Sequence, residues 1–186
     1  MVPLGSLWIP LLLSAVIVFL ASSVIHMVLG YHRHDFRRTP DESAAQDAFR
    51  RLGIGPGDYA IPCAGSSKDM KDPAFVEKMS RGPVVFMTVL PGGQNYMGSA
   101  LGFWFVYCVI VSLFGAYVAG RALAVGAHYL DVFRFVGTVT FACYAMALPQ
   151  ASIWYKKNWM TTLRSMVDGL IYGSLTAGTF GWLWPR

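Results

Sequence analysis

The sequence predicts an all-α membrane protein: a four-transmembrane-helix bundle, forming a single membrane domain, with a partly helical cytoplasmic loop. Hydrophobic residues make up 55% of the 186 residues and charged residues 13%, with a mean hydropathy of +0.46, too apolar for an ordinary soluble domain. Most charges lie in residues 31–98. Four apolar stretches approach or exceed about 20 residues, the length that a helix needs to cross the hydrocarbon core. They are residues 7–30, 99–120, 132–155 and 163–184.

The first stretch, residues 7–30, contains no Asp, Glu, Lys or Arg. It lacks the basic leading region of a signal peptide, and its apolar run is longer than a signal core. We therefore expect this stretch to remain in the protein as a span.

The loop that follows, residues 31–98, contains two helix-start signals. Thr39 followed by Pro40 predicts a helix that ends at Gly53, and Asp72 followed by Pro73 predicts a second one. Two short helices bury too little surface to fold alone. We expect the loop to lie against the membrane face or a partner.

Two further parts of the loop have different compositions. Residues 54–67 are dense in glycine and proline and predict irregular chain. The apolar run at residues 84–90 is too short to span. This run, within residues 83–91, fits an interfacial strand, a re-entrant piece or the lead into the second helix. The interfacial strand is the interpretation favoured here.

Small residues recur on two of the predicted helices and indicate close helix contacts. They are Gly169, Gly173, Ala177 and Gly181 on the fourth span, and Ser112, Ala116 and Gly120 on the second. The contacts fit either the same bundle or another chain in a homo- or hetero-oligomer. In the third span, Pro149 predicts a kink beside Gln150, because proline frees a carbonyl one turn earlier.

The orientation follows from basic residues, which collect on the cytoplasmic side of membrane helices. They flank the end of the first span, the start of the second and the connection between the third and fourth: Arg33, Arg37, Arg38, Lys78, Arg81, Lys156, Lys157 and Arg164. Both termini are thus expected outside. Tryptophans at both predicted boundaries agree with this direction: Trp8, Trp182 and Trp184 outside, Trp154 and Trp159 inside.

The net charge of +5 does not indicate nucleic-acid binding, since the basic residues flank apolar segments instead of forming a stripe with interleaved aromatics. Anionic lipid headgroups are the expected partner. The three cysteines, Cys63, Cys108 and Cys143, show no metal-binding spacing and no disulfide framework.

Polar side chains inside the spans are the candidate functional residues, because they are costly in lipid and usually face protein or water. Asp168 lies about one turn inside the fourth span, and His26 is similarly deep in the first. Gln150 on the third span and Asn95 and Ser99 at the entry of the second complete one predicted polar layer. Two roles are open for Asp168: pairing with Arg164, or a proton or cation site with His26.

Histidines suggest two cofactor hypotheses. His26, His32, His34 and Asp35 are candidate metal ligands, although His32 and His34 follow the basic flank and are expected in water. A haem held by two histidines of one chain is disfavoured, because the third and fourth spans contain no histidine and His128 lies in the outer loop. A haem shared with another chain stays open, and the cofactor is undetermined. Nucleotide-binding and hydrolase motifs are not found.

The segments YHRHDFRRTPDE, WFVYCVIVSLFGAYVAGR and DGLIYGSLTAGTFGWLWP resemble a group of small uncharacterised bacterial inner-membrane proteins. The resemblance implies a bacterial inner-membrane setting and no activity.

Three functions are therefore considered. The first is a structural or accessory subunit that associates with other membrane proteins through its small-residue helix faces. The second is a small solute or proton-coupled transporter that uses Asp168 and His26. The third is a metal-dependent membrane enzyme.

Overall fold

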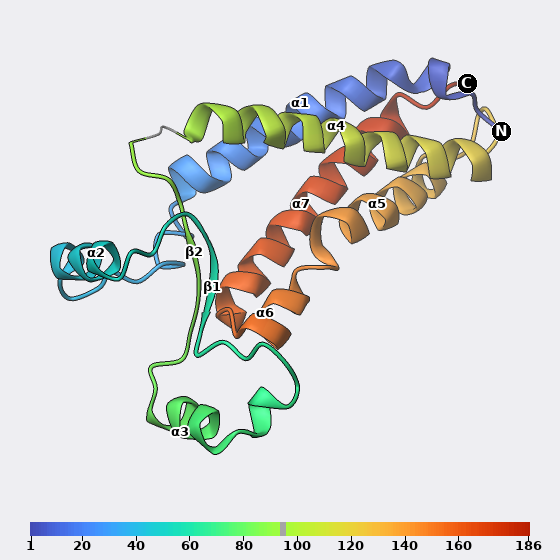
Figure 1. The fold of residues 1–186 in the computed structure, drawn as a ribbon. Coiled ribbons are helices and arrows are strands. Elements are labelled where there is room, and N and C mark those ends of the chain that lie inside the picture. Colours follow the sequence, from blue (N-terminus) through green and yellow to red (C-terminus); the bar gives the residue numbers. More distant parts are fainter. Residues whose placement is uncertain (94–95) are drawn as a thin grey trace. The chain divides into compact units, whose positions relative to one another are not determined.

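The computed structural model describes residues 1–93 and 96–186, and 66% of the chain is helical (Figure 1). It divides into two units, which are described separately. The helical unit comprises Met1–Phe36 and Tyr96–Arg186, and the polar unit is Arg37–Asn95.

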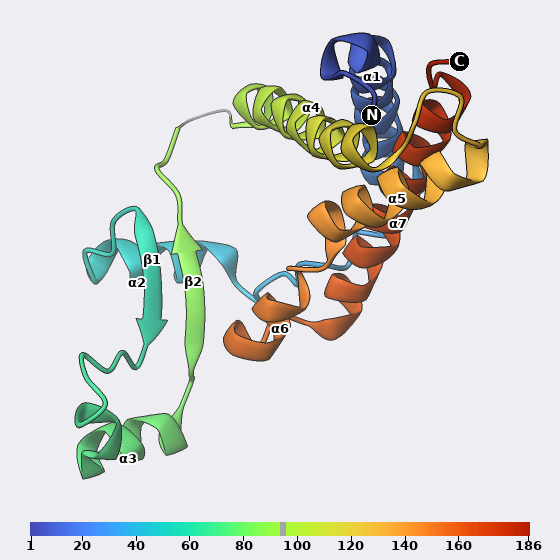
Figure 2. The same ribbon diagram turned by 90° about the vertical axis from the view of Figure 1, so that its right-hand side faces the viewer.

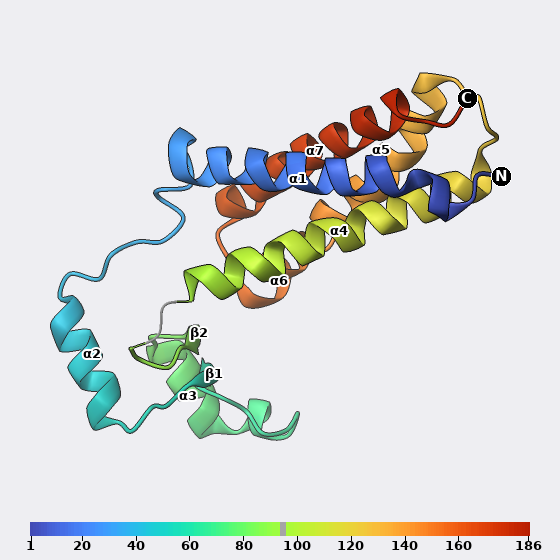
Figure 3. The same ribbon diagram turned by 90° about the horizontal axis from the view of Figure 1, so that it is seen from above.

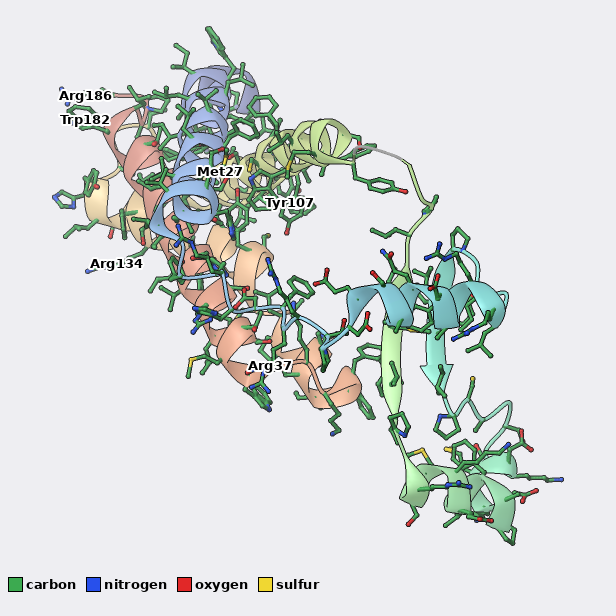
Figure 4. All side chains as sticks on the ribbon, turned by 90° about the vertical axis from the view of Figure 1, so that its left-hand side faces the viewer. Met27, Arg37, Tyr107, Arg134, Trp182 and Arg186 are labelled. Atoms are coloured by element: carbon green, nitrogen blue, oxygen red, sulfur yellow. The ribbon has the colours of Figure 1, made fainter. Side chains whose placement is uncertain are left out.

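Three stretches of helix are long and apolar enough to cross a membrane: Leu4–Leu29, Met97–Ala122 and Tyr129–Tyr155. A fourth long helix, α7 (Trp159–Trp182), is more polar and falls outside this group. Large apolar side chains cover the outside of the helical unit; Met27 and Trp182, labelled in Figure 4, are 78% and 83% exposed. Such an apolar outer surface matches a lipid environment.

The first membrane-crossing stretch consists of three consecutive pieces. A 3₁₀ turn (Leu4–Leu7) leads into α1 (Trp8–Val24), and a π-helical turn (Ile25–Leu29) completes the stretch. It ends at Gly30, whose φ of 64° is a left-handed conformation that glycine adopts without steric cost. The widened π turn carries His26, and such turns often occur at functional sites.

The second and third stretches differ in continuity. Helix α4 (Met97–Ala122) is unbroken, whereas the third is divided into α5 (Tyr129–Ala145) and α6 (Pro149–Tyr155). The sequence predicts a kink at Pro149, and the structure has a full interruption there. Helix α5 ends at Ala145, the residue four positions earlier, with which the proline ring would clash in a continuous helix.

The α7 small-residue face packs against α5 (Figure 1). A Cβ atom added at Gly169 would lie 2.9 Å from the Ala145 Cβ, and one at Gly173 would lie 3.1 Å from the Phe141 backbone nitrogen. Because a Cβ atom at either position would require the neighbouring atoms to shift, the glycines allow the two backbones to approach closely.

The α4 small-residue face packs within the same chain as well. Helix α4 lies beside α1, seen from above in Figure 3. Ser14 and Ser112 share a buried hydrogen bond of 3.0 Å, and the Val2 backbone N–H donates to the Gly120 carbonyl at 2.7 Å. Both predicted small-residue faces are therefore covered, at least in part, by helices of this chain.

The polar unit contains a small sheet that the all-α prediction did not include. Strands β1 (Gly57–Ile61) and β2 (Val85–Val89) pair antiparallel in Figure 2, with Gly57 opposite Val89. The prediction of irregular chain for residues 54–67 is thus wrong for β1. Pairing with the distant run at 84–90, which is a strand, creates β1, and composition alone does not reveal such a pairing.

The helices of the polar unit follow their caps. Helix α2 (Glu42–Arg51) starts two residues later than predicted, because the Asp41 side chain accepts from the Ala44 backbone N–H. Helix α3 (Pro73–Arg81) starts at the predicted proline, capped by Asp72. No described residue of this unit is buried.

The α5–α7 contact gives the first prediction. Gly173→Leu should lower the stability of the helical unit by about 1–3 kcal/mol, the usual cost of overpacking a close contact. Thermal unfolding in mild detergent, followed by circular dichroism, measures the change. Gly102→Leu on α4 is the matched control, since nothing lies within 4 Å of a Cβ there. Equal melting temperatures for the two variants would contradict the packing described here.

Candidate ion-binding site

The segment after α1 returns to the start of α7 and places one imidazole between two carboxylates. His32 Nδ1 lies 2.6 Å from Asp35 Oδ2, and His32 Nε2 lies 2.8 Å from Asp168 Oδ2. The side chains are largely buried, with exposed fractions of 12% for His32, 10% for Asp35 and 4% for Asp168. Local turns of the chain, in which Arg33 and Asp35 donate to the carbonyls of Gly30 and His32, position His32 and Asp35.

Asp35 is held from the other side by α7. Arg164 Nη1 donates to Asp35 Oδ1 at 3.1 Å, and the Thr161 hydroxyl donates to the same oxygen at 3.2 Å. Desolvation alone would raise the pKa of Asp35, but the hydrogen bonds from His32, Arg164 and Thr161 outweigh it and hold the pKa below its ordinary value. Asp35 is therefore an ionised anchor that joins the α1 exit to α7.

The proton count at His32 is unusual. A neutral imidazole donates from one nitrogen only, so it satisfies one of two facing carboxylates. Because Asp35 is ionised, either His32 is an imidazolium, or Asp168 carries a proton, or a cation lies at the Nε2 side. Each of these states adds one positive charge or one proton at the contact with Asp168. The arrangement is therefore suited to holding a proton or a cation.

A second histidine lies beside this contact. The His26 ring centroid is 4.5 Å from that of His32, and the Tyr31 ring centroid is 4.3 Å from His32. One ligand atom each from His26, His32 and Asp168 lies within 4.8 Å of the others. Three potential metal ligands thus converge from the end of α1, the following turn and α7.

Several buried polar atoms near this cluster have no hydrogen-bond partner among the described residues. Asp168 Oδ1 is one, and the others are the hydroxyls of Tyr31, Tyr144 and Tyr172. Tyr172 lies one turn beyond Asp168 on α7, and its ring centroid is 5.5 Å from that of Tyr144. Within the helical unit, polar atoms without a partner among the described residues are therefore found at Asp168 and also at Tyr172 and Tyr144.

A pocket of about 340 Å³ opens beside the cluster and reaches His32 and Asp35, while Asp168 is not part of its lining. Its walls come from the α1 end and from the start of α7: His26, His32, Asp35, Phe36, Lys157, Asn158, Thr161 and Ser165.

The structure brings together only part of the predicted polar layer. His26 and Asp168 converge, whereas Ser99 bonds locally to the Tyr96 carbonyl and Gln150 is exposed at the start of α6. Asn95 lies outside the described residues. Of the proposed metal ligands, His34 is exposed and stands outside the cluster.

Two expectations about partners are wrong. Asp168 pairs with His32, while Arg164 pairs with Asp35, because Asp35 lies within reach of the guanidinium. His32 does not lie in water, since the chain folds back after Gly30. Sequence reasoning named Asp35 only as a possible metal ligand beside His26, His32 and His34, and it missed the Asp35 contacts with Arg164 and Thr161. No local spacing relates Asp35 to α7, so no sequence signal marked those contacts.

Comparisons of the chain with protein-family models, curated proteins and solved structures found no match. The structure itself has three stretches long and apolar enough to cross a membrane, consistent with a multi-pass membrane protein, and an ionisable cluster where α1 ends beside α7.

The cluster gives the second prediction. Arg164→Gln should cost about 1.5–3 kcal/mol of stability at neutral pH, because the buried Asp35 loses a charged hydrogen-bond donor. Asp35, with its lowered pKa, contributes stability that is present above its unfolded pKa and lost as pH falls below about 4. The difference from wild type should therefore shrink in acid. Melting temperatures of both proteins, measured from pH 3 to 7 in steps on the order of one pH unit, show whether this difference shrinks.

Arg134→Gln is the matched control. Arg134 also pairs with an aspartate, Asp131 at 3.5 Å, but it is 71% exposed and projects away from the helices in Figure 4. Its loss should cost at most about 1 kcal/mol. If both arginine variants lose equal stability, Arg164 does not hold a buried partner.

Proposed function

We propose that this chain is a small cation transporter of the bacterial inner membrane. The observation that carries the proposal is Asp168, which is 3% exposed, with one carboxylate oxygen on His32 and the other without a partner among the described residues. A carboxylate inside a membrane helix costs about 2.5–3.5 kcal/mol on insertion scales, and such residues mark ion pathways. A pocket opens at His32, the partner of Asp168, and Tyr172, whose hydroxyl has no partner among the described residues, lies one turn further along α7.

The proposed topology has four spans, with both termini outside and the polar unit in the cytoplasm. Hydrogen bonds at the two chain ends support an even number of spans. Val2 donates to the Gly120 carbonyl, and the indole of Trp184 donates to the Ala124 carbonyl. One end is thus bound to the last turn of α4 and the other to the connection that directly follows it. The lower hydropathy of α7 reflects its glycines, Arg164 and Asp168, which lie toward neighbouring segments.

A purely structural role for the cluster is the competing explanation. A structural ion pair is normally satisfied at every buried atom, since an unpartnered polar atom costs about 1–3 kcal/mol. Asp168 keeps one oxygen without a partner while a pocket lies beside the pair. These two features favour an exchangeable ion over a fixed clamp.

The third prediction tests the topology with a native cysteine. Cys63 is exposed in the polar unit, whereas Cys108 is buried and Cys143 half-buried in the helical unit. A membrane-impermeant maleimide should label Cys63 in inverted vesicles and not in intact cells. Cys63→Ser should remove the label. Labelling of Cys63 in intact cells would reverse the proposed orientation.

The fourth prediction tests transport. The full chain in proteoliposomes should move at least one of H⁺, K⁺, Na⁺ or Zn²⁺, each followed with an ion-specific fluorescent dye. Asp168→Asn removes the carboxylate charge and should reduce the flux to that of protein-free vesicles. Asp131 is an exposed aspartate in the first turn of α5. The Asp131→Asn variant should transport like wild type. No flux of any of the four ions, or equal flux in both variants, would reject the proposal.

A second candidate is an accessory subunit, favoured by the polar unit. Its sheet has two strands only, and none of its described residues is buried, so a partner surface would stabilise it. The accessory role predicted from the sequence depends on small-residue faces that bind other proteins. These faces support it less, because they contact helices of the same chain. A stoichiometric second protein in the sample purified for transport would favour this candidate, and a homogeneous chain would count against it.

A further inference from the structure

We propose that His26, His32 and Asp168 form a site for a divalent transition-metal ion, with Zn²⁺ as the representative probe. This inference deepens the proposed function, on which it rests, by naming the class of cation. The donor set is two imidazoles and one carboxylate, contributed by the π turn, the turn after Gly30 and α7. Hard cations such as Mg²⁺ and Ca²⁺ prefer all-oxygen ligands, whereas imidazole suits Zn²⁺ and its neighbours.

The distances between donor atoms need adjustments of up to about 1.5 Å to fit a zinc ion. Zinc–ligand bonds of about 2.0–2.1 Å place tetrahedral ligands about 3.3 Å apart. The three donor atoms lie within 4.8 Å of one another, and the His32–Asp168 pair at 2.8 Å must open slightly. His26 is exposed at the pocket edge and makes no hydrogen bond among the described residues, so its ring can turn against His32 without breaking one.

Asp35 supplies the support that a metal-binding histidine normally has. A ligating imidazole donates its other N–H to a carboxylate, which sets its tautomer and makes it a better ligand. Asp35 Oδ2 accepts from His32 Nδ1 at 2.6 Å, which directs the Nε2 lone pair toward Asp168 and the ion. Arg164 and Thr161 in turn fix Asp35.

A second, independent observation points to a ligand. Asp168 Oδ1 is buried without a partner among the described residues, and the side chain that carries it is 4% exposed. An ion beside Asp168 satisfies this oxygen or the one now facing His32. Three protein ligands also leave one tetrahedral position open, and the pocket lined by His26 and His32 can admit water or an exchanging ligand there.

The fifth prediction measures metal binding by the full chain, purified in mild detergent and stripped with a chelator. Isothermal titration with ZnCl₂ should show one saturable site. His26→Ala and Asp168→Asn should abolish it. Asp35→Asn should weaken it by about 10–100-fold, as loss of a carboxylate behind a ligating histidine does. Titration with Co²⁺ should give a visible absorption band that disappears in the same variants.

His34→Ala is the matched control, because His34 is exposed only two residues from His32 and stands outside the cluster. It should bind Zn²⁺ like wild type. The inference is overturned if wild type shows no saturable site, if His34→Ala loses binding, or if His26→Ala binds normally. His26→Ala breaks no hydrogen bond among the described residues, so it keeps the test decisive even if Asp168→Asn fails to fold.

The two proposals fail separately. Zinc binding that depends on His26 and Asp168, without flux of any tested ion, would reject transport and leave the metal site standing. Flux of H⁺, K⁺ or Na⁺ that depends on Asp168, without zinc binding, would reject the metal site and leave transport standing.

Discussion

The close contact between α5 and α7 sets the position of everything else at the candidate site. In lipid, the hydrophobic effect does not drive helices together, so backbone approach through small residues has to provide the contact. Gly169 and Gly173 provide it, with Ala145 and Phe141 opposite them on α5. Asp168 directly precedes Gly169, so this packing fixes where the carboxylate lies.

The buried carboxylate in turn determines the path of the chain after α1. Burying a charge requires a partner, and breaking a buried pair by removing one partner is strongly destabilising. His32 reaches Asp168 only because the chain turns at Gly30 and folds back against the start of α7. Asp35 then binds Arg164, which completes an ion-pair network across elements far apart in the sequence. A cluster built in this way ties the end of α1 to α7, and in the function proposed above it is the place where a cation replaces a proton.

The polar unit follows a different physical logic. It contains a two-stranded sheet and two capped helices, and its described residues are all at least partly exposed. A unit with so little burial gains little free energy from the hydrophobic effect. The helical unit contains the buried clusters and the candidate ion site, which fits a division between an ion-binding part and an adaptable part.

What could be read from the sequence depended on local signals. Membrane character follows from apolar length and the α3 start from Asp72 and Pro73, while Pro149 predicted a kink where the structure has a full interruption. Asp168 and His26 were recognisable because polar groups inside apolar helices are rare.

The tertiary structure decided the partners. Strand β1 forms only by pairing with a run about thirty residues later, and its register joins Gly57 to Val89. His32 and Asp168 are 136 positions apart, so no periodicity brings them together. Arg164, which is only four positions from Asp168 along the chain, pairs with Asp35 instead. Sequence alone thus determined which residues are costly to bury in a membrane. The fold determined which group offsets each cost, because that choice depends on distances in space between side chains far apart along the chain.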